Sequence, residues 1–218
     1  MNLERSFRQS PATNTIVLAI VAVYLLTAFQ SHSLLNNLSA SSLGDSWMLY
    51  APAMTHGWGP LRAVGATFLH IGPGHMLLNL MLLWLLGREL EKYLGAGLFA
   101  MVYLVGGIGA SAAVVWMDPL SPTAGASGAI YALMAILVGL FARRGADLRA
   151  PLTLIAVNLG YTFLADNVSL WGHVGGLITG AILAWPLMKA TQERTRWFIA
   201  IASLIGAVIV LFLGIPYP

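Results

Sequence analysis

The sequence predicts an all-α, polytopic membrane protein with seven membrane-spanning helices. Of its 218 residues, 58% are hydrophobic and only 9% are charged, whereas soluble domains carry about 25% charged residues. The mean hydropathy is +0.80. A chain this apolar has too little polar surface to cover a globule in water, so lipid is the expected solvent.

Seven apolar runs approach the length of about 20 residues that a spanning helix needs. They cover Asn14–Gln30, His75–Leu94, Leu98–Met117, Ser127–Phe141, Pro151–Ala165, Gly172–Leu187 and Trp197–Leu213. The first run follows two arginines and lacks a small-residue cleavage site, so it is expected to remain as the first span. The fourth and fifth runs are short, which predicts that their outer ends begin below the membrane surface.

The basic residues orient these spans. With the N-terminus in the cytoplasm, ten of the eleven Lys and Arg residues fall on the inner side, and only Arg62 lies outside. The inner residues are Arg5, Arg8, Arg88, Lys92, Arg143, Arg144, Arg149, Lys189, Arg194 and Arg196. An excess of positive charge on the cytoplasmic side is typical of membrane proteins. The pattern therefore predicts a cytoplasmic N-terminus and an external C-terminus.

The outer segment between the first two spans, residues 31–74, is too long for a simple connector. It holds Trp47, Tyr50 and Trp58 among moderately apolar residues. Amphipathic rings prefer the membrane–water interface, so we expect a partly structured loop that lies there.

Composition also excludes several classes of function. A net charge of +3, scattered along the chain, does not indicate nucleic-acid binding. The absence of cysteine excludes disulfides, thiolate metal sites and a cysteine nucleophile.

Few strongly polar groups lie inside the spans, where such groups are costly and usually functional. They are His75 and Asn79 in the second span, Ser127 in the fourth, Asn158 in the fifth and His173 in the sixth. The second, fourth and sixth spans all run inward, and each begins with one of these groups. His75, Ser127 and His173 are therefore expected at one shallow depth on the outer side. Asn158 is expected to make a packing contact.

Small residues predict that the fourth and sixth spans touch. Gly172, Gly176 and Gly180 form a ridge on the sixth span, and small residues at Gly128, Ala132 and Ala135 face them from the fourth. Such packing would bring the Ser127 hydroxyl within reach of the His173 ring. A serine needs a base to become a nucleophile, so the pattern favours a Ser–His dyad.

The same region offers the other parts of an acyl-transfer site. Tyr131 lies one turn after Ser127 and could hold the base by stacking. The Ser127 backbone N–H and the side chains of His75 and Asn79 are candidate donors to an oxyanion. Gly125 and Gly128 would keep the turn open for a substrate backbone.

Five segments in this order resemble the rhomboid family of intramembrane serine proteases. They are "LR" at 61–62, "TFLHIGPGHMLLN" at 67–79, "GRELEKYLG" at 87–95, "GASGAIYALM" at 125–134 and "HVGGLITG" at 173–180. The segments that contain His75, Ser127 and His173 are each weak alone and jointly specific. One departure is Leu61 before Arg62, where the family often has tryptophan.

The resemblance implies roles for individual residues. Ser127 would be the nucleophile, His173 the general base, and His75 and Asn79 the oxyanion donors. Tyr131 would stack on the base. The remaining implied roles are structural: His70 and Arg62 would hold the first loop and its junction with the second span, and Glu91 would pair at the inner end.

The resemblance also implies the organisation of the chain. Residues 1–13 would be a short cytoplasmic N-terminus, and residues 14–189 a rhomboid-like catalytic core of six helices. Residues 190–218 would add a seventh, C-terminal helix. We expect a bacterial inner membrane, with the active site facing the outside. The expected partners are the lipid bilayer and membrane-protein substrates that enter laterally beside the fifth span. No nucleic acid is expected as a partner. No metal or organic cofactor is expected.

Three alternatives remain open at this point. His70, His75 and His173 could form a metal site, although no carboxylate ligand lies near them in the sequence. A non-catalytic rhomboid-like protein could bind membrane segments. A transporter would carry polar groups and broken helices at the midplane, where this chain has only Asn158.

Overall fold

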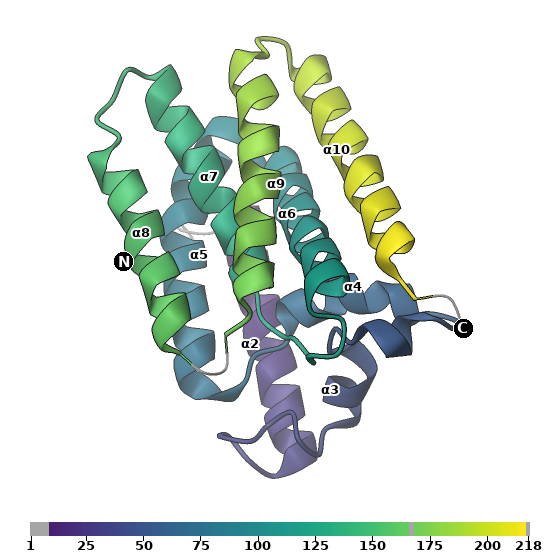
Figure 1. Cartoon of the computed structure of the whole chain (residues 1–218). Helices are drawn as coiled ribbons and strands as arrows, with labels where there is room; N and C mark the ends of the chain where they lie inside the picture. Colours follow the sequence, from purple (N-terminus) through teal and green to yellow (C-terminus); the bar gives the residue numbers. More distant parts are fainter. Residues whose placement is uncertain (1–8, 166–167, 217–218) are drawn as a thin grey trace. The chain divides into compact units, whose positions relative to one another are not determined.

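The computed structural model describes residues 9–165 and 168–216, and this part of the chain is predominantly helical (Figure 1). Its seven long helices are α2 (Pro11–Ser31), α5 (Gly72–Leu94), α6 (Ala96–Met117), α7 (Ser127–Arg143), α8 (Arg149–Leu164), α9 (Leu170–Lys189) and α10 (Glu193–Gly214). Each overlaps one predicted span. Within the described residues the only extended pairing is an isolated bridge between Leu49 and Thr123. The all-α fold class is therefore confirmed.

Four of these helices are long and apolar enough to cross a membrane by length and composition, namely α2, α6, α9 and α10. The pair formed by Gly59–Phe68 and Gly72–Leu94 passes the same test together but is bent by 82°. Helix α7 has 17 residues and α8 has 16, in agreement with the prediction that the fourth and fifth runs are short. The chain is thus a multi-pass membrane protein.

The chain forms two compact units, which are described separately. The first contains the residues before Met101, Pro119–Ala126 and the residues after Gly214, and the second contains Met101–Asp118 and Ser127–Gly214. The boundary before α7 falls between Ala126 and Ser127. The expected division into residues 1–13, 14–189 and 190–218 stays a prediction.

In the first unit, α2 packs against α5, and a buried carboxylate joins them. Glu91, near the end of α5, accepts hydrogen bonds of 2.8 Å from the backbone N–H groups of Ala12 and Thr13 and of 2.7 Å from the Thr13 hydroxyl. The first N–H groups of a helix have no partner within the helix. Glu91 therefore caps α2. These hydrogen bonds are the physical basis of a structural role for Glu91.

The segment between α2 and α5 is structured, as expected. It contains α3 (Ser42–Trp47), η1 (Ala51–Met54), η2 (Gly59–Leu61), α4 (Arg62–Gly65) and η3 (Ala66–Phe68). A Cβ atom on Gly65 would lie 1.7 Å from the Trp47 ring, so α3 packs directly on α4. The Arg62 guanidinium donates to the carbonyl of Met48 at 2.8 Å. Trp58 is 85% exposed, and Trp47 is the ring that anchors this segment.

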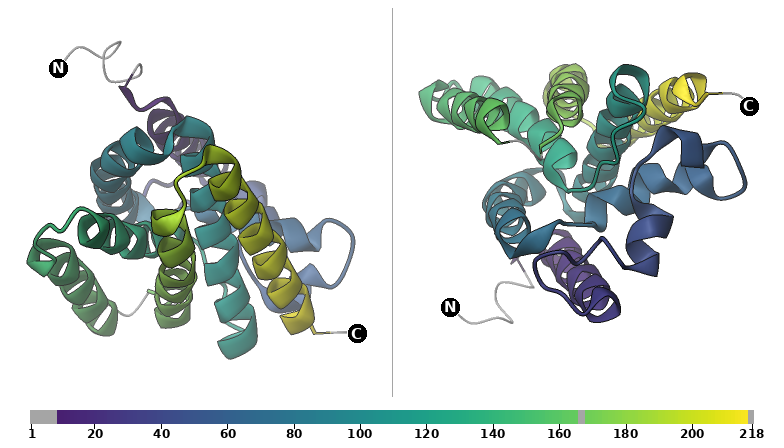
Figure 2. Two further views of the ribbon diagram at one scale, coloured as in Figure 1. Left: turned by 90° about the horizontal axis from the view of Figure 1, so that it is seen from above. Right: turned by 60° about the horizontal axis from the view of Figure 1, so that its bottom comes forward.

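In the second unit, α7 lies beside α9, and α8 and α10 flank this pair (Figures 1 and 2). Most residues of α7 are buried. In contrast, α10 exposes apolar side chains along its length, including Phe198, Ile205 and Leu213. Exposed apolar area of this extent is unfavourable in water. It suits a helix that faces lipid.

Candidate active site

Ser127 is the first residue of α7, and the backbone before it is held in an unusual conformation. Gly125 has φ 142°, a value that side chains rarely tolerate. Its N–H donates to the carbonyl of Ala66 at 2.9 Å, within the first unit. This turn delivers the chain into α7 with serine at the helix N-terminus, where backbone N–H groups are directed at potential ligands.

His173 lies in the first turn of α9, which begins at Leu170. Its imidazole is 5% exposed and stacks on the Tyr131 ring, with the centroids 4.1 Å apart and the planes inclined by 21°. The structure therefore brings Tyr131 and His173 together. The expected start of this span at Gly172 was two residues late, because the Ser169 side chain accepts from the Gly172 N–H and caps the helix earlier.

Thr162 of α8 also contacts His173, although no sequence pattern indicates this residue. Its hydroxyl oxygen lies 2.7 Å from Nδ1 of His173 and 3.1 Å from the Tyr131 hydroxyl. The same hydroxyl donates to the carbonyl of Asn158, four residues earlier, at 3.1 Å. A threonine that bonds back to its own helix is unremarkable in a membrane span, so its polarity gave no sequence signal.

Helices α7 and α9 touch through their backbones beside these residues. A Cβ atom on Gly176 would lie 2.0 Å from the carbonyl oxygen of Gly128, and one on Gly180 would lie 2.3 Å from that of Ala132. Only small residues permit such an approach. Since Gly128 follows Ser127 and Gly176 lies one turn after His173, Ser127 and His173 lie at the same end of this helix pair.

His75 and Asn79 belong to the first unit and lie in the first two turns of α5. Nδ1 of His75 accepts a long hydrogen bond of 3.4 Å from the N–H of Ile71, which places the ring proton on Nε2. The Asn79 amide donates one hydrogen to the carbonyl of His75 at 2.9 Å. An amide carries two hydrogens, so each side chain has a donor position beyond these contacts.

His70 is fully buried, just before α5, and binds backbone with its ring. Nε2 accepts from the N–H of Ala126 at 3.3 Å, and Nδ1 lies 3.4 Å from the carbonyl of Phe68. Burial, assisted by the nearby ring of His75, lowers the pKa of His70 to about 3. His70 is therefore neutral at physiological pH, and it holds the residue that precedes Ser127.

The structure describes one further polar position within a span, Asn158. Asn158 donates to the carbonyl of Leu154 in its own helix at 2.9 Å, and its expected packing contact stays a prediction. Asp166, in the segment between the fifth and sixth predicted spans, lies outside the described residues. Across the described ranges, no group of three or more His, Asp or Glu side chains is arranged to hold a metal ion.

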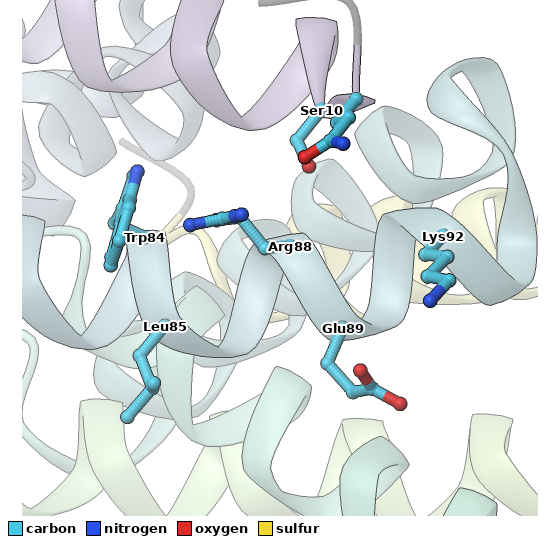
Figure 3. A pocket seen from close by; sticks show the side chains of 7 residues that line it. Ser10, Trp84, Leu85, Arg88, Glu89 and Lys92 are labelled. Carbon is cyan, nitrogen blue, oxygen red and sulfur yellow. The ribbon is translucent and has the colours of Figure 1, made fainter. Parts of the chain in front are cut away.

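A polar cavity of about 470 Å³ opens on the first unit, between the start of α2 and the end of α5 (Figure 3). Trp84 and Arg88 lie on the side of α5 that faces Ser10, with the guanidinium 4.6 Å from the indole centroid. Leu85 and Glu89 point away from Ser10. The cavity lies at the opposite end of α5 from His75 and Asn79, so it is separate from the predicted site.

Comparison with known proteins places the chain in a family. The Rhomboid domain profile matches residues 57–190, more than half of the chain. Rhomboid protease GluP of Bacillus subtilis is 37% identical over 182 residues, an alignment that spans 80% of this chain but 33% of that protein. Rhomboid protease GlpG of Pectobacterium atrosepticum is 29% identical, over 86% of this chain and 67% of that protein.

Putative rhomboid protease YdcA of Bacillus subtilis, at 26% identity, is covered over 96% of its length, and 88% of this chain is aligned. The profile match includes η2, α4 and the helices from α5 to α9, with every residue singled out around Ser127 and His173. The chain belongs to the rhomboid family of intramembrane proteases.

Proposed function

We propose that the protein is an intramembrane serine endopeptidase that cleaves peptide bonds in or near membrane-spanning segments of other proteins. The observation that carries this proposal is the setting of His173. Its buried ring is held by Tyr131 and Thr162 at the end of the α7–α9 pair where Ser127 begins α7. A serine nucleophile needs a base within hydrogen-bond reach of its hydroxyl, and the shared end of the α7–α9 pair supports the pairing of His173 with Ser127.

The proposed reaction follows acyl transfer. Nε2 of His173 removes the Ser127 hydroxyl proton as Oγ attacks the substrate carbonyl carbon, and a tetrahedral oxyanion forms. The C–N bond then breaks, and His173 returns the proton to the leaving amine. Water, activated by the same nitrogen, attacks the acyl-enzyme, and its breakdown releases the new carboxyl end and restores Ser127.

The oxyanion donors in this proposal are the Ser127 N–H, Nε2–H of His75 and the second amide hydrogen of Asn79. The assignment of His75 and Asn79 rests on the family motif order and on the hydrogens that their own contacts leave for a ligand. Gly125 keeps a side chain away from the approach to Ser127, whereas Gly128 lets Ala110 of α6 and the backbone of Gly172 in α9 pack closely. Small residues around the serine favour a small substrate side chain, such as alanine, before the cleaved bond.

The distribution of basic residues supports a cytoplasmic N-terminus, with Ser127 and His173 near the outer surface of a bacterial inner membrane. Substrate segments would enter laterally beside α8. The alternative proposal is a rhomboid-like protein that binds membrane segments without cleaving them. The two differ in one respect, which is whether Ser127 reacts.

A cleavage assay tests the proposal. The purified protein in detergent is incubated with a single-span substrate, beside the variants Ser127→Ala and His173→Ala. Each variant is expected to lose about 10⁴-fold or more in kcat, the scale seen when a nucleophile or base is removed. The matched controls Ser46→Ala and His56→Ala change exposed residues outside the site and are expected to cleave normally.

Cleavage by Ser127→Ala at the wild-type rate would refute the dyad. Binding of the substrate by wild-type protein, without cleavage by wild type or variants, would favour the non-catalytic alternative.

A further inference from the structure

We propose that Thr162 is the positioning residue for His173. Through this contact, the tautomer of the His173 imidazole depends on the position of helix α8. This inference rests on the proposed function. It concerns a residue that the family motifs do not single out and that lies on a different helix from both members of the dyad.

The hydrogen bonds around Thr162 can be counted. A hydroxyl group offers one hydrogen and two acceptor positions. The hydrogen is donated to the carbonyl of Asn158, since a carbonyl can only accept. The two acceptor positions are then left for the Tyr131 hydroxyl at 3.1 Å and for Nδ1 of His173 at 2.7 Å. All three contacts are satisfied at once only if Nδ1 carries a hydrogen.

This assignment fixes the tautomer of the base. With the hydrogen on Nδ1, the lone pair of the neutral ring is on Nε2, which is the nitrogen that must receive the serine proton. In triad proteases a carboxylate performs this orientation. Here a neutral hydroxyl takes its place, and Tyr131 restrains both the ring, by stacking, and the hydroxyl, by its hydrogen bond.

The position of Thr162 on α8 gives this contact a second consequence. Pro151 and Thr162 are the buried residues of α8, and most of the helix is exposed or half-buried. Thr162 is therefore the buried polar residue through which α8 contacts the α7–α9 pair. A displacement of α8 would break the hydrogen bond between Thr162 and Nδ1 of His173. The tautomer with its hydrogen on Nδ1 is therefore stabilised only while α8 packs against the α7–α9 pair.

Two readouts test the inference. The first is kinetic. Thr162→Val removes the hydroxyl at constant shape and is expected to lower kcat by about 10- to 100-fold, which is part of the contribution of a positioned base. KM is expected to stay unchanged. Thr162→Ser keeps the hydroxyl and should restore most of kcat. Thr153→Val, an exposed position on the same helix, is the control and should cleave as wild type does.

The second readout is ¹⁵N NMR of the imidazole groups, which needs no turnover. The chain has five histidines, so His173 can be assigned by its loss in His173→Ala. Wild type is expected to show the hydrogen on Nδ1, and Thr162→Val is expected to lose this preference while Thr162→Ser keeps it. The NMR comparison holds even if the cleavage assay shows the proposed function to be wrong.

Specific outcomes would overturn the inference. They are an unchanged kcat in Thr162→Val, equal loss in Thr162→Ser and Thr162→Val, a change confined to KM, or an Nδ1 hydrogen that persists without the hydroxyl. If wild type is inactive and the tautomer still depends on Thr162, the positioning contact stands and only the proposed chemistry fails.

Discussion

At the scale of single residues, Gly176 decides how closely α9 approaches α7. Its missing side chain leaves room for the carbonyl of Gly128, which a Cβ atom would meet at 2.0 Å. That carbonyl belongs to the residue after Ser127. The separation of the two helices at this point therefore affects the distance between Ser127 and His173, the proposed nucleophile and base.

Gly176→Ala is expected to separate the helices, to lower the free energy of unfolding by about 1–3 kcal/mol as overpacking does, and to reduce cleavage. Thermal unfolding in detergent and the cleavage assay measure the two effects. The matched control is Gly206→Ala on α10, where a Cβ atom would meet nothing within 4 Å. If the two variants behave alike, backbone contact at Gly176 does not organise the site.

The sequence singled out Ser127 and His173 as candidates because serine and histidine are conspicuous in an apolar span, and Tyr131 because it lies one turn after Ser127. Thr162 was not found for the opposite reason. Its hydroxyl satisfies its own helix, and its partnership with His173 joins α8 to α9 across the fold. Contacts of that kind depend on tertiary packing, which hydrophobic patterning does not specify.

At the scale of elements, helices α2 and α5 are joined by one buried carboxylate. Glu91 is 3% exposed and accepts three hydrogen bonds at the start of α2. The positive end of the helix dipole favours a negative group at this position. The cap therefore ties the first helix to the end of α5, away from His75 and Asn79.

Glu91→Ala would leave the buried donors of Thr13 and the half-buried N–H of Ala12 without their acceptor, and an unsatisfied buried group costs about 1–3 kcal/mol. We expect a lower melting temperature. The control, Glu89→Gln, alters a carboxylate that points away from Ser10 in the same helix and should have a smaller effect. Equal melting temperatures for Glu91→Ala and wild type would contradict the capping role.

The lengths and types of the helices followed from the sequence, while some of their ends did not. The second span was expected to begin at His75, but α5 begins at Gly72 because Pro73 fits the first helical turn. Apolar runs in the sequence indicate which residues face the lipid or the protein core. Helix ends depend instead on local caps and turns.

At the scale of the whole molecule, apolar composition and the sided distribution of charge were sufficient to predict an all-α membrane fold. The close contact of α7 with α9 also followed from small residues at regular spacing. The internal order of residues 31–74 could be expected only in outline, because its short helices are stabilised by particular contacts such as Trp47 on Gly65.

Because His70 is buried and neutral, we expect the stability of the folded protein to decrease in acid. Its pKa in the folded state is about 3, against an ordinary value of 6.5. Between these values the unfolded chain takes up a proton that the folded chain excludes, so stability falls as pH decreases from about 6.5 towards 3. Between pH 7 and 5 we expect a loss of about 1–2 kcal/mol from this group.

Thermal unfolding in detergent across this range measures the effect. His70→Asn, whose side chain does not titrate, should be less stable at pH 7 but should lose less stability on acidification. Identical acid dependence in the two proteins would contradict the assignment.

In the proposed mechanism, His173 activates Ser127. The most direct measurement is covalent labelling with a serine-reactive fluorophosphonate, followed by peptide mass spectrometry. We expect one adduct, on Ser127, that is formed by wild type and lost in His173→Ala under conditions where both proteins remain folded. An adduct on another serine, or equal labelling of Ser127 without His173, would contradict the account.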